Sequence, residues 1–377
     1  MKTTRGIICL MLVLFFLLSG CLPAQSVETM TPTLPSKEQQ IQPSATAPAT
    51  PTPAITATPA PFFTVYGDQP IVPNGESGAW DDRFTDPGAV IYHDGTFHMF
   101  RNGFRGFPAE SQVGYVTSPD GFTWTQQGTD PVFMTQDVPY VKIGMFVSSV
   151  IVEDDGTWVL YFYTWDTNSF PSSSVIGRAT ASSPTGPWLA DEEPVLHPGT
   201  SGAWDDKQVT APHVIKTEDG YRMYYTAIDS KRNQWIGMAT STDGVHWEKY
   251  NDPATTDKPF AESDPVFQSG GPGTWDAGFV QQPRVFQTAN GWTMFYRATP
   301  GRTEGSMKYG VAFGSDGIHW ERSALNPLFE PNDVPKTSLF WFTNILFQNG
   351  TYFLFVEVDM QHTTEIYLLT HTGELTP

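Results

Sequence analysis

The chain has 377 residues, with 21 Lys+Arg against 40 Asp+Glu, a formal charge of −19 and only two cysteines. A balance this acidic, without any basic cluster, argues against nucleic acid as a partner. Two cysteines cannot build a disulfide framework. The fold must therefore depend on an apolar core.

The N-terminus has the pattern of an export signal. Lys2 and Arg5 precede the apolar run IICLMLVLFFLL, which is too short to span a bilayer, so residues 1–20 are predicted to be a signal peptide. The run ends in LSGC, which resembles a bacterial lipoprotein box and implies cleavage before Cys21 and lipidation of that cysteine. An ordinary secretory signal, cut after a small residue, is the alternative.

A low-complexity segment follows. From about residue 23 to 61 the chain is mostly Thr, Pro, Ala, Ser and Gln, which cannot bury enough apolar surface to fold. Residues 21–61 are thus predicted to be a lipid-carrying, disordered tether, and residues 62–377 the folded domain. The expected location is extracytoplasmic, anchored by lipid to a bacterial membrane at the cell surface or in the periplasm, and a monomer is expected.

The folded part contains repeats. A short proline-containing strand occurs five times, as QPIV (69–72), DPVF (130–133), EPVL (193–196), DPVF (264–267) and NPLF (326–329). Asp-Gly turns recur as SPDGFTW (118–124), STDGVHW (241–247) and SDGIHW (315–320). Between them lie pairs of strand-like runs around a glycine, the pattern of antiparallel hairpins. Five such units predict an all-β, five-bladed β-propeller whose N-terminal strand completes the last blade and closes the ring.

A second motif recurs as GAWDD (78–82), GAWDD (202–206) and GTWDA (273–277). Residues that recur in step with the blades are expected to build them. We therefore predict that Trp80, Trp204 and Trp275 pack between sheets, and that Asp81, Asp205 and Asp276 cap turns.

One position breaks the repeat. Counting back nine residues from the hairpin glycines 95, 156, 220, 291 and 350 gives Asp86, Val147, Ala211, Gln282 and Trp341. Only Asp86 is ionisable, and each position opens an innermost strand that faces the central channel. Asp86 is therefore the first candidate for chemistry, although an Asp before a Pro can also simply begin a strand.

The stretch TDPGAVIYHDGTFHMF, from Thr85 to Phe100, resembles the first-blade signature of the five-bladed glycosidases, which include arabinanases, β-xylosidases, invertases, levansucrases and, more remotely, mannoside phosphorylases. In the arabinanase and xylosidase branch the matching Asp is the general base that activates water. The resemblance implies that role for Asp86. It covers the whole propeller, from residue 62 to 377.

The sequence also departs from that branch. Val147 stands where a second Asp is expected, and Thr210 stands where the resemblance expects the general acid, a Glu. The Asn-Asp-Pro, Arg-Asp-Pro and Glu-Cys motifs of invertases are absent. Because glycoside hydrolysis needs two carboxyl groups, the acid must come from elsewhere. The possible acids just past the second strands are Glu110, Asp166, Asp229, Glu304, Glu357 and Asp359. Asp166 and Asp229 are favoured because each follows its strand by only a residue or two.

Other side chains at the same end of the ring are candidates for binding sugar hydroxyls or apolar sugar faces. They are Arg101, Arg105, Trp165, Thr210, His213, Gln282, Arg284, Arg297, Trp341 and Glu357. For His213 a hydrogen-bonded place in the channel wall is an alternative, and no metal or other cofactor is expected.

Three functions fit this pattern. The first is a surface-tethered glycoside hydrolase acting on an oligo- or polysaccharide, with Asp86 as base. The second is a noncatalytic propeller that binds a glycan or a protein, since a fold alone does not decide function. The third, a glycoside phosphorylase, ranks last because an exported enzyme would lose its sugar phosphate to the medium.

Overall fold

The computed structural model describes residues 62–106, 111–165, 172–288, 290–303, 307–334, 339–359 and 363–376. These residues belong to a compact unit that starts at Thr58. The predicted signal peptide, the lipidation site Cys21, the tether and Asp166 lie outside the described residues. Those predictions are untested by the fold.

The recurring Asp-Gly turn shows why these sequences form hairpins. In the third blade the Ser241 hydroxyl accepts hydrogen bonds from the backbone of Asp243 and Gly244, while the Asp243 carboxylate accepts from Val245 and His246. Gly244 has a φ of 72°, which side chains rarely adopt. Its carbonyl also accepts the hydroxyl of Tyr161 from the preceding blade. The turn therefore both reverses the chain and joins two blades.

Five antiparallel sheets result. Blade one contains β2 (Phe84–His93), β3 (Thr96–Phe104), β4 (Gln112–Ser118), β5 (Thr125–Gln126) and β6 (Phe133–Met134). Blade two contains β7 (Gly144–Val152), β8 (Trp158–Trp165), β9 (Ile176–Ala181) and β10 (Leu189–Ala190). Blade three contains β11 (Gln208–Thr217), β12 (Gly220–Ile228), β13 (Gln234–Ser241), β14 (Glu248–Lys249) and β15 (Pro265–Phe267).

Blade four contains β16 (Phe279–Thr288), β17 (Gly291–Thr299), β18 (Lys308–Gly314) and β19 (Glu321–Arg322). Blade five contains β20 (Phe340–Gln348), β21 (Thr351–Asp359), β22 (Thr364–Thr372) and the N-terminal β1 (Thr64–Val65). Two short 3-10 turns, Thr135–Asp137 and Pro331–Asp333, complete the regular structure of the described residues.

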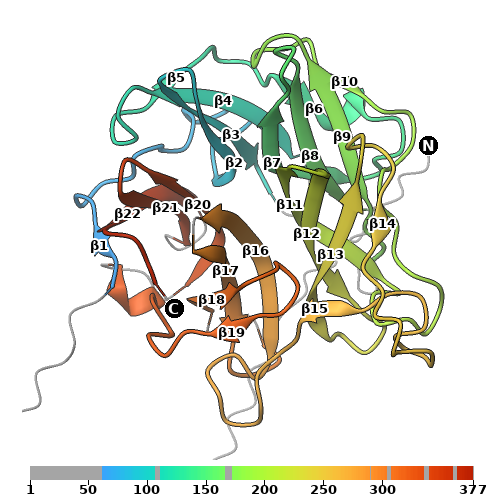
Figure 1. The fold of residues 1–377 in the computed structure, drawn as a ribbon. Helices are drawn as coiled ribbons and strands as arrows, with labels where there is room; N and C mark the ends of the chain where they lie inside the picture. Colours follow the sequence, from blue (N-terminus) through green and yellow to red (C-terminus); the bar gives the residue numbers. More distant parts are fainter. Residues whose placement is uncertain are drawn as a thin grey trace, which may run out of the picture. The chain divides into compact units, whose positions relative to one another are not determined.

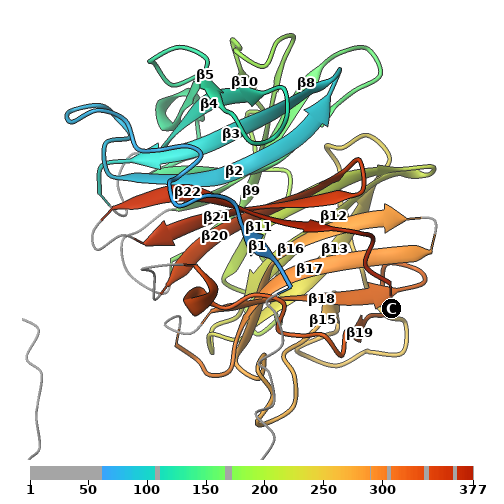
Figure 2. The same cartoon turned by 90° about the vertical axis from the view of Figure 1, so that its left-hand side faces the viewer.

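The sheets surround a common axis, with β2, β7, β11, β16 and β20 innermost (Figure 1). Strand β2 contacts both β7 and β20, so the ring is closed between the first and last blades. Figure 2 shows the N-terminal segment beside the red strands of the last blade, where Thr64 pairs with Thr370. The predicted five-bladed β-propeller, closed by its N-terminal strand, is confirmed.

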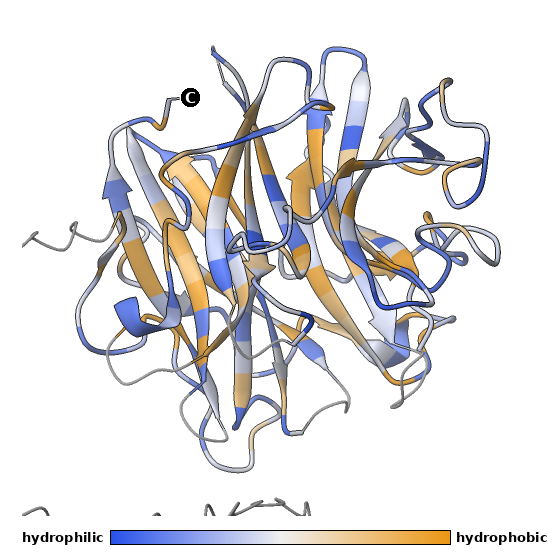
Figure 3. Ribbon diagram, turned by 90° about the horizontal axis from the view of Figure 1, so that it is seen from below, coloured by the Kyte–Doolittle hydropathy of each residue, from blue (hydrophilic) through white to orange (hydrophobic). Residues whose placement is uncertain are grey.

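The five proline-containing segments share one structural role. Each pairs with the third strand of its blade, through Phe133 with Val113, Leu196 with Ile176, Phe267 with Ile236, Phe329 with Tyr309 and Val72 with Ile366. Because Val72 pairs within the fifth blade, QPIV takes part in ring closure as expected. Apolar residues concentrate in the strands and fill the space between sheets (Figure 3).

The first aspartate of the GAWDD motif does not cap a turn, contrary to the prediction. Asp81, Asp205 and Asp276 are buried and form ion pairs with Arg101, Lys249 and Arg322. The capping role belongs to the next residue in two copies, where Asp82 and Asp206 accept the backbone N–H of Gly78 and Gly202. The buried first aspartate needs a cation because an unpaired buried charge is costly.

This pairing predicts a large loss of stability for Asp81→Asn. The substitution leaves the buried guanidinium of Arg101 without its carboxylate, and breaking such a pair costs about 3–5 kcal/mol of unfolding free energy. Asp154→Asn is the matched control, since Asp154 is fully exposed in its pair with Lys216 and is expected to cost less than about 1 kcal/mol. Urea unfolding measures both; equal effects would contradict the assignment.

Within the described residues, we find no helix with the length and apolar character needed to cross a membrane.

Candidate active site at the central channel

Every inner strand is irregular near its start. Strand pairing shifts at Asp86/Ala89, Val147/Ser149, Thr210/His213, Gln281/Arg284 and Phe340/Thr343. Such bulges re-aim side chains and are frequent beside active sites. In this propeller they surround the axis.

The strand pairing corrects how the blades were aligned by counting back from the hairpin glycines. Asp86 pairs with Asn102, and the residues in the same register are Thr210, opposite Thr226, and Gln281, opposite Arg297. The count had equated Asp86 with Ala211 and Gln282 instead. It fails because Gly95 lies in its turn, whereas Gly220 and Gly291 already belong to the returning strands. Asp86 remains the ionisable member of this set.

Asp86 is buried, with 1% of its surface exposed. Its Oδ1 accepts hydrogen bonds from the Asn102 side chain and from the Gly88 backbone, both at 2.8 Å. Its Oδ2 has no hydrogen-bond partner among the described residues. Burial raises the pKa of Asp86 to about 7, against the opposing effects of those two hydrogen bonds and the Arg284 charge. The carboxyl group can therefore change protonation state near neutral pH.

A small cavity of about 10 Å³ lies beside this carboxyl group, enough for roughly one water molecule. All five inner strands contribute to its wall. The lining residues are Asp86, Gly88, Asn102, Phe146, Val147, Ser148, Tyr163, Ala211, Arg284, Phe342 and Thr343. The cavity thus lies on the axis of the ring.

A second carboxyl group is buried nearby. Glu357 on β21 is 2% exposed, and its Oε2 accepts the backbone N–H of Phe342 at 3.1 Å. Burial and then the Asp86 charge raise the pKa of Glu357 well above its ordinary value. The Asp86 charge is therefore close enough to Glu357 to favour the protonated form of that side chain.

Two buried arginines accompany the pair. Arg284 donates to the Ser148 hydroxyl at 3.2 Å, and burial lowers its pKa to about 10. Arg297 donates to the side chain of Gln281 at 3.2 Å and lies 5.7 Å from the ring centre of Phe342. Arg284 opposes the pKa rise of Asp86, and Arg297 that of Glu357. The site therefore combines two acids with two cations.

Two predicted sugar-binding residues join adjacent blades instead of presenting free groups. His213 Nδ1 accepts the backbone N–H of Val285 at 3.1 Å, and Gln282 Oε1 accepts that of Thr343 at 3.4 Å. Burial, followed by the Arg284 charge, lowers the pKa of His213 to about 3, so its ring is neutral. Thr210 is buried as well, and its hydroxyl donates to the Thr226 carbonyl. For His213, the channel-wall alternative agrees with this geometry.

Asp229, one of the two predicted acids, is bound within its own turn. It accepts hydrogen bonds from the backbones of Lys231 and Asn233 and from the Asn233 side chain. Among the arginines, Arg101 is paired with Asp81, and the exposed Arg105 with Asp82. None of these residues lines the cavity at Asp86.

The aromatic candidates lie at strand ends. Trp165 is the last residue of β8, and Trp341, in β20, donates to Asp359 at 3.4 Å. Both are partly exposed. Residues 107–110, 166–171, 304–306, 335–338 and 360–362 lie outside the described residues.

Several residues of the site were missed from the sequence. Asn102 holds Asp86 and also bonds both backbone groups of Val147 in the next blade. The hydroxyl of Tyr163 is buried near both carboxyl groups, whose charges contribute to raising its pKa. The available signal for Asn102 was its place beside Arg101 near the end of a second strand, where the hairpin returns to the level of Asp86.

Comparison with known proteins agrees with this architecture. Residues 81–263 match the family model described as the glycosyl hydrolases family 32 N-terminal domain. This span is just under half of the chain and includes Asp86, blades one and two, and blade three up to β14. Over this span the chain is similar in sequence to that glycosidase family, and its fold is that of a five-bladed β-propeller.

The proteins to which this chain is similar are distant from it in sequence. The uncharacterized protein Rv1502 of Mycobacterium tuberculosis is 23% identical over 234 residues, which cover 60% of this chain and 71% of that protein. A structure of the GH130 family of mannoside phosphorylases, which contains hydrolases of β-1,2 mannosidic linkages, has a TM-score of 0.62 at 16% identity and covers 84% of this chain and 95% of its own. The β-1,2-mannobiose phosphorylase of Listeria innocua has a TM-score of 0.57 at 12% identity, covering 82% and 96%. These structural similarities establish the fold.

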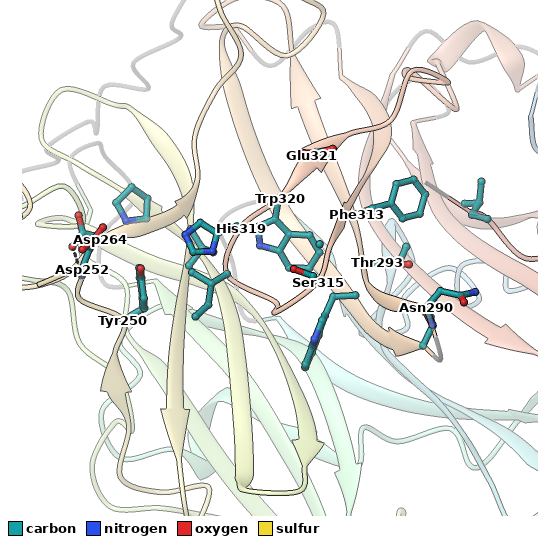
Figure 4. Close-up of a pocket in the computed structure, with 17 residues that line it drawn as sticks. Tyr250, Asp252, Asp264, Asn290, Thr293, Phe313, Ser315, His319, Trp320 and Glu321 are labelled. Carbon is teal, nitrogen blue, oxygen red and sulfur yellow. Dashed lines mark hydrogen bonds between the residues drawn. The ribbon is translucent and has the colours of Figure 1, made fainter. Parts of the chain in front are cut away.

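The propeller also has a larger cavity away from the axis. It has a volume of about 720 Å³ and lies beside the outer parts of blades three and four (Figure 4). Tyr250, His319 and Trp320 line it, together with Asp252 and Asp264. Asp264 accepts hydrogen bonds from the backbone of Asp252 and from a threonine hydroxyl, so it stabilises its own loop. The paired buried carboxyl groups make the channel the better candidate for a reaction centre.

Proposed function

We propose that this protein is a glycoside hydrolase acting on an oligo- or polysaccharide, with Asp86 as the general base. The observation that carries the proposal is the buried Asp86 carboxyl group, which has one oxygen held by two hydrogen bonds and the other without a protein partner beside a water-sized cavity. The similarity of residues 81–263 to a glycosyl hydrolase family model supports the same reaction class.

The geometry suits a base. The bonds from Asn102 and Gly88 fix the orientation of the carboxyl group, so Oδ2 is the atom available to accept a proton from water. A base works best when its pKa lies near the working pH, and burial brings Asp86 into that range. The water then becomes nucleophilic enough to attack the anomeric carbon.

The direct test is sugar release by the full-length protein in detergent from a panel of plant and microbial glycans. The assay is run with and without inorganic phosphate. Release of free sugar independent of phosphate supports hydrolysis. Release that requires phosphate and yields sugar phosphate supports the phosphorylase alternative, for which Arg284 supplies a buried cation in the channel.

Noncatalytic glycan binding is the second candidate. The aromatic-lined cavity of Figure 4 favours it, because tyrosine and tryptophan faces pack against the apolar faces of sugars. A folded protein that binds a glycan on an array, loses that binding in Tyr250→Ala and releases no sugar would favour this function over hydrolysis.

We further propose export and lipid anchoring through Cys21. An exported glycosidase would meet its polysaccharide outside the cytoplasm, and the LSGC sequence supplies the attachment site. Cells fed a radiolabelled fatty acid are expected to label the wild-type protein and not Cys21→Ala, which should leave the membrane fraction. Equal labelling of both proteins would contradict the anchor.

A further inference from the structure

The general acid expected in blade three has no carboxyl group at its position. Thr210 occupies that site and its hydroxyl is bonded to the Thr226 carbonyl, so it has no acidic proton to donate. Asp229 in the same blade is held by three hydrogen bonds from its own turn. A proton donor must therefore come from another blade.

Glu357 lies beside this site in blade five, behind Phe342, and does not itself line the cavity at Asp86. It lies within β21, opposite the bulge that contains Trp341 and Phe342, because Phe340 pairs with Val358 and Thr343 with Val356. The bulge turns the Phe342 backbone N–H toward Glu357 Oε2. Phe342 itself lines the cavity at Asp86. One residue thus contacts the second acid and borders the cavity beside the first.

A hydroxyl group provides a second connection between the two acids. Thr364 Oγ1 accepts the backbone N–H of Thr85 at 3.2 Å and lies 3.4 Å from the Thr85 carbonyl, next to Asp86 in sequence. The same side chain forms a hydrogen bond with Glu357. Glu357 and Asp86 are therefore joined across the seam at which the last blade meets the first.

We propose that Glu357 is the general acid of this site and takes the place of the missing blade-three glutamate. The inference rests on the proposed hydrolase function. Glu357 donates its proton to the glycosidic oxygen while the bond from that oxygen to the anomeric carbon breaks, its electron pair remaining on the oxygen. Water attacks the anomeric carbon and gives its proton to Asp86. One water is consumed, two hydroxyl products leave, and a proton returns from Asp86 to Glu357 through solvent.

The surrounding charges suit this division of roles. Asp86 and Arg297 are the charged groups that act on Glu357, and Tyr163 is buried near both acids. Since the pKa of Glu357 is raised further by the Asp86 charge, the pair passes through a state in which Asp86 is ionised and Glu357 retains its proton. This one-proton state is what acid–base catalysis requires.

The test compares two substrates that differ in their need for an acid. One is the oligosaccharide that the protein cleaves fastest in the panel assay. The other is a 2,4-dinitrophenyl glycoside of the same sugar, whose leaving group departs without protonation. Glu357→Gln is expected to lower kcat/KM about 10²- to 10⁴-fold on the oligosaccharide and less than about tenfold on the aryl glycoside. The pH profile of kcat/KM for this variant on the oligosaccharide should also lack the fall at alkaline pH that deprotonation of a general acid causes.

Asp86→Asn is expected to lose activity on both substrates, because water must be activated in either case. Glu357→Asp keeps an acid and should restore part of the oligosaccharide activity, which a purely structural role would not predict. Equal losses on both substrates in Glu357→Gln, or no loss on either, would overturn the assignment of Glu357 alone. A wild-type protein that cleaves neither substrate would contradict the proposed hydrolase function itself.

Discussion

Asp86→Asn is expected to lower kcat/KM for glycan hydrolysis by about 10²- to 10⁴-fold, the usual contribution of a general base. Asparagine keeps the oxygen that accepts from Asn102 and Gly88, so the side chain should stay in place. What it loses is the ability to take a proton from water. Initial rates across a range of substrate concentrations measure the effect.

The matched control is Asp229→Asn, which changes another buried carboxyl group in the same way. Asp229 is bound within its turn and does not line the cavity, so its replacement should leave kcat/KM within about tenfold of wild type. If instead Asp229→Asn abolished hydrolysis and Asp86→Asn did not, the base would be misassigned. The wild-type rate should also rise with pH through about 7 as Asp86 ionises.

The same substitution should stabilise the fold at alkaline pH. The pKa of Asp86 is 3.8 ordinarily and about 7 in the folded protein, so between these values the folded state binds more protons than the unfolded state. Wild-type stability must then fall as pH rises through that window, by up to about 4 kcal/mol. Asparagine carries no charge and escapes this loss.

Urea unfolding of wild type and Asp86→Asn at about pH 4 and pH 8 measures this difference. The two proteins should differ least in stability at the lower pH, where Asp86 is protonated in the folded state and about half ionised in the unfolded state. At the higher pH the variant should be the more stable. A difference in unfolding free energy that does not change with pH would show that the carboxyl group ionises freely in the fold.

Much of the fold could be predicted because each repeated motif has its own local chemistry. The serine and aspartate of STDGVHW form the turn by themselves, and the proline segments join the third strands of their blades. The odd position of Asp86 was visible for the same reason. A residue that the other blades lack is not needed to form a blade, so its presence calls for another explanation.

The sequence names Glu357 as one of six possible acids but gives no reason to select it as the partner of Asp86. Glu357 reaches the site because the last blade meets the first, and the hydrogen bond between Thr85 and Thr364 joins residues 279 positions apart. No local pattern encodes such a contact. Likewise, Arg101, His213 and Gln282 look like polar channel residues in the sequence. In the structure Arg101 forms an ion pair with Asp81, and His213 and Gln282 each accept a backbone N–H from the next blade.

The most direct test of the central claim is the titration of the two carboxyl groups by carbon-13 NMR. The protein is labelled at the side-chain carboxyl carbons of aspartate and glutamate, and the signals are assigned from Asp86→Asn and Glu357→Gln. We predict that Asp86 titrates near pH 7 and that Glu357 titrates well above the ordinary range of a glutamate, and that the Glu357 titration moves to lower pH in Asp86→Asn, where the like charge is gone. If both groups titrate near pH 4, as exposed carboxyl groups do, the acid–base pair does not exist.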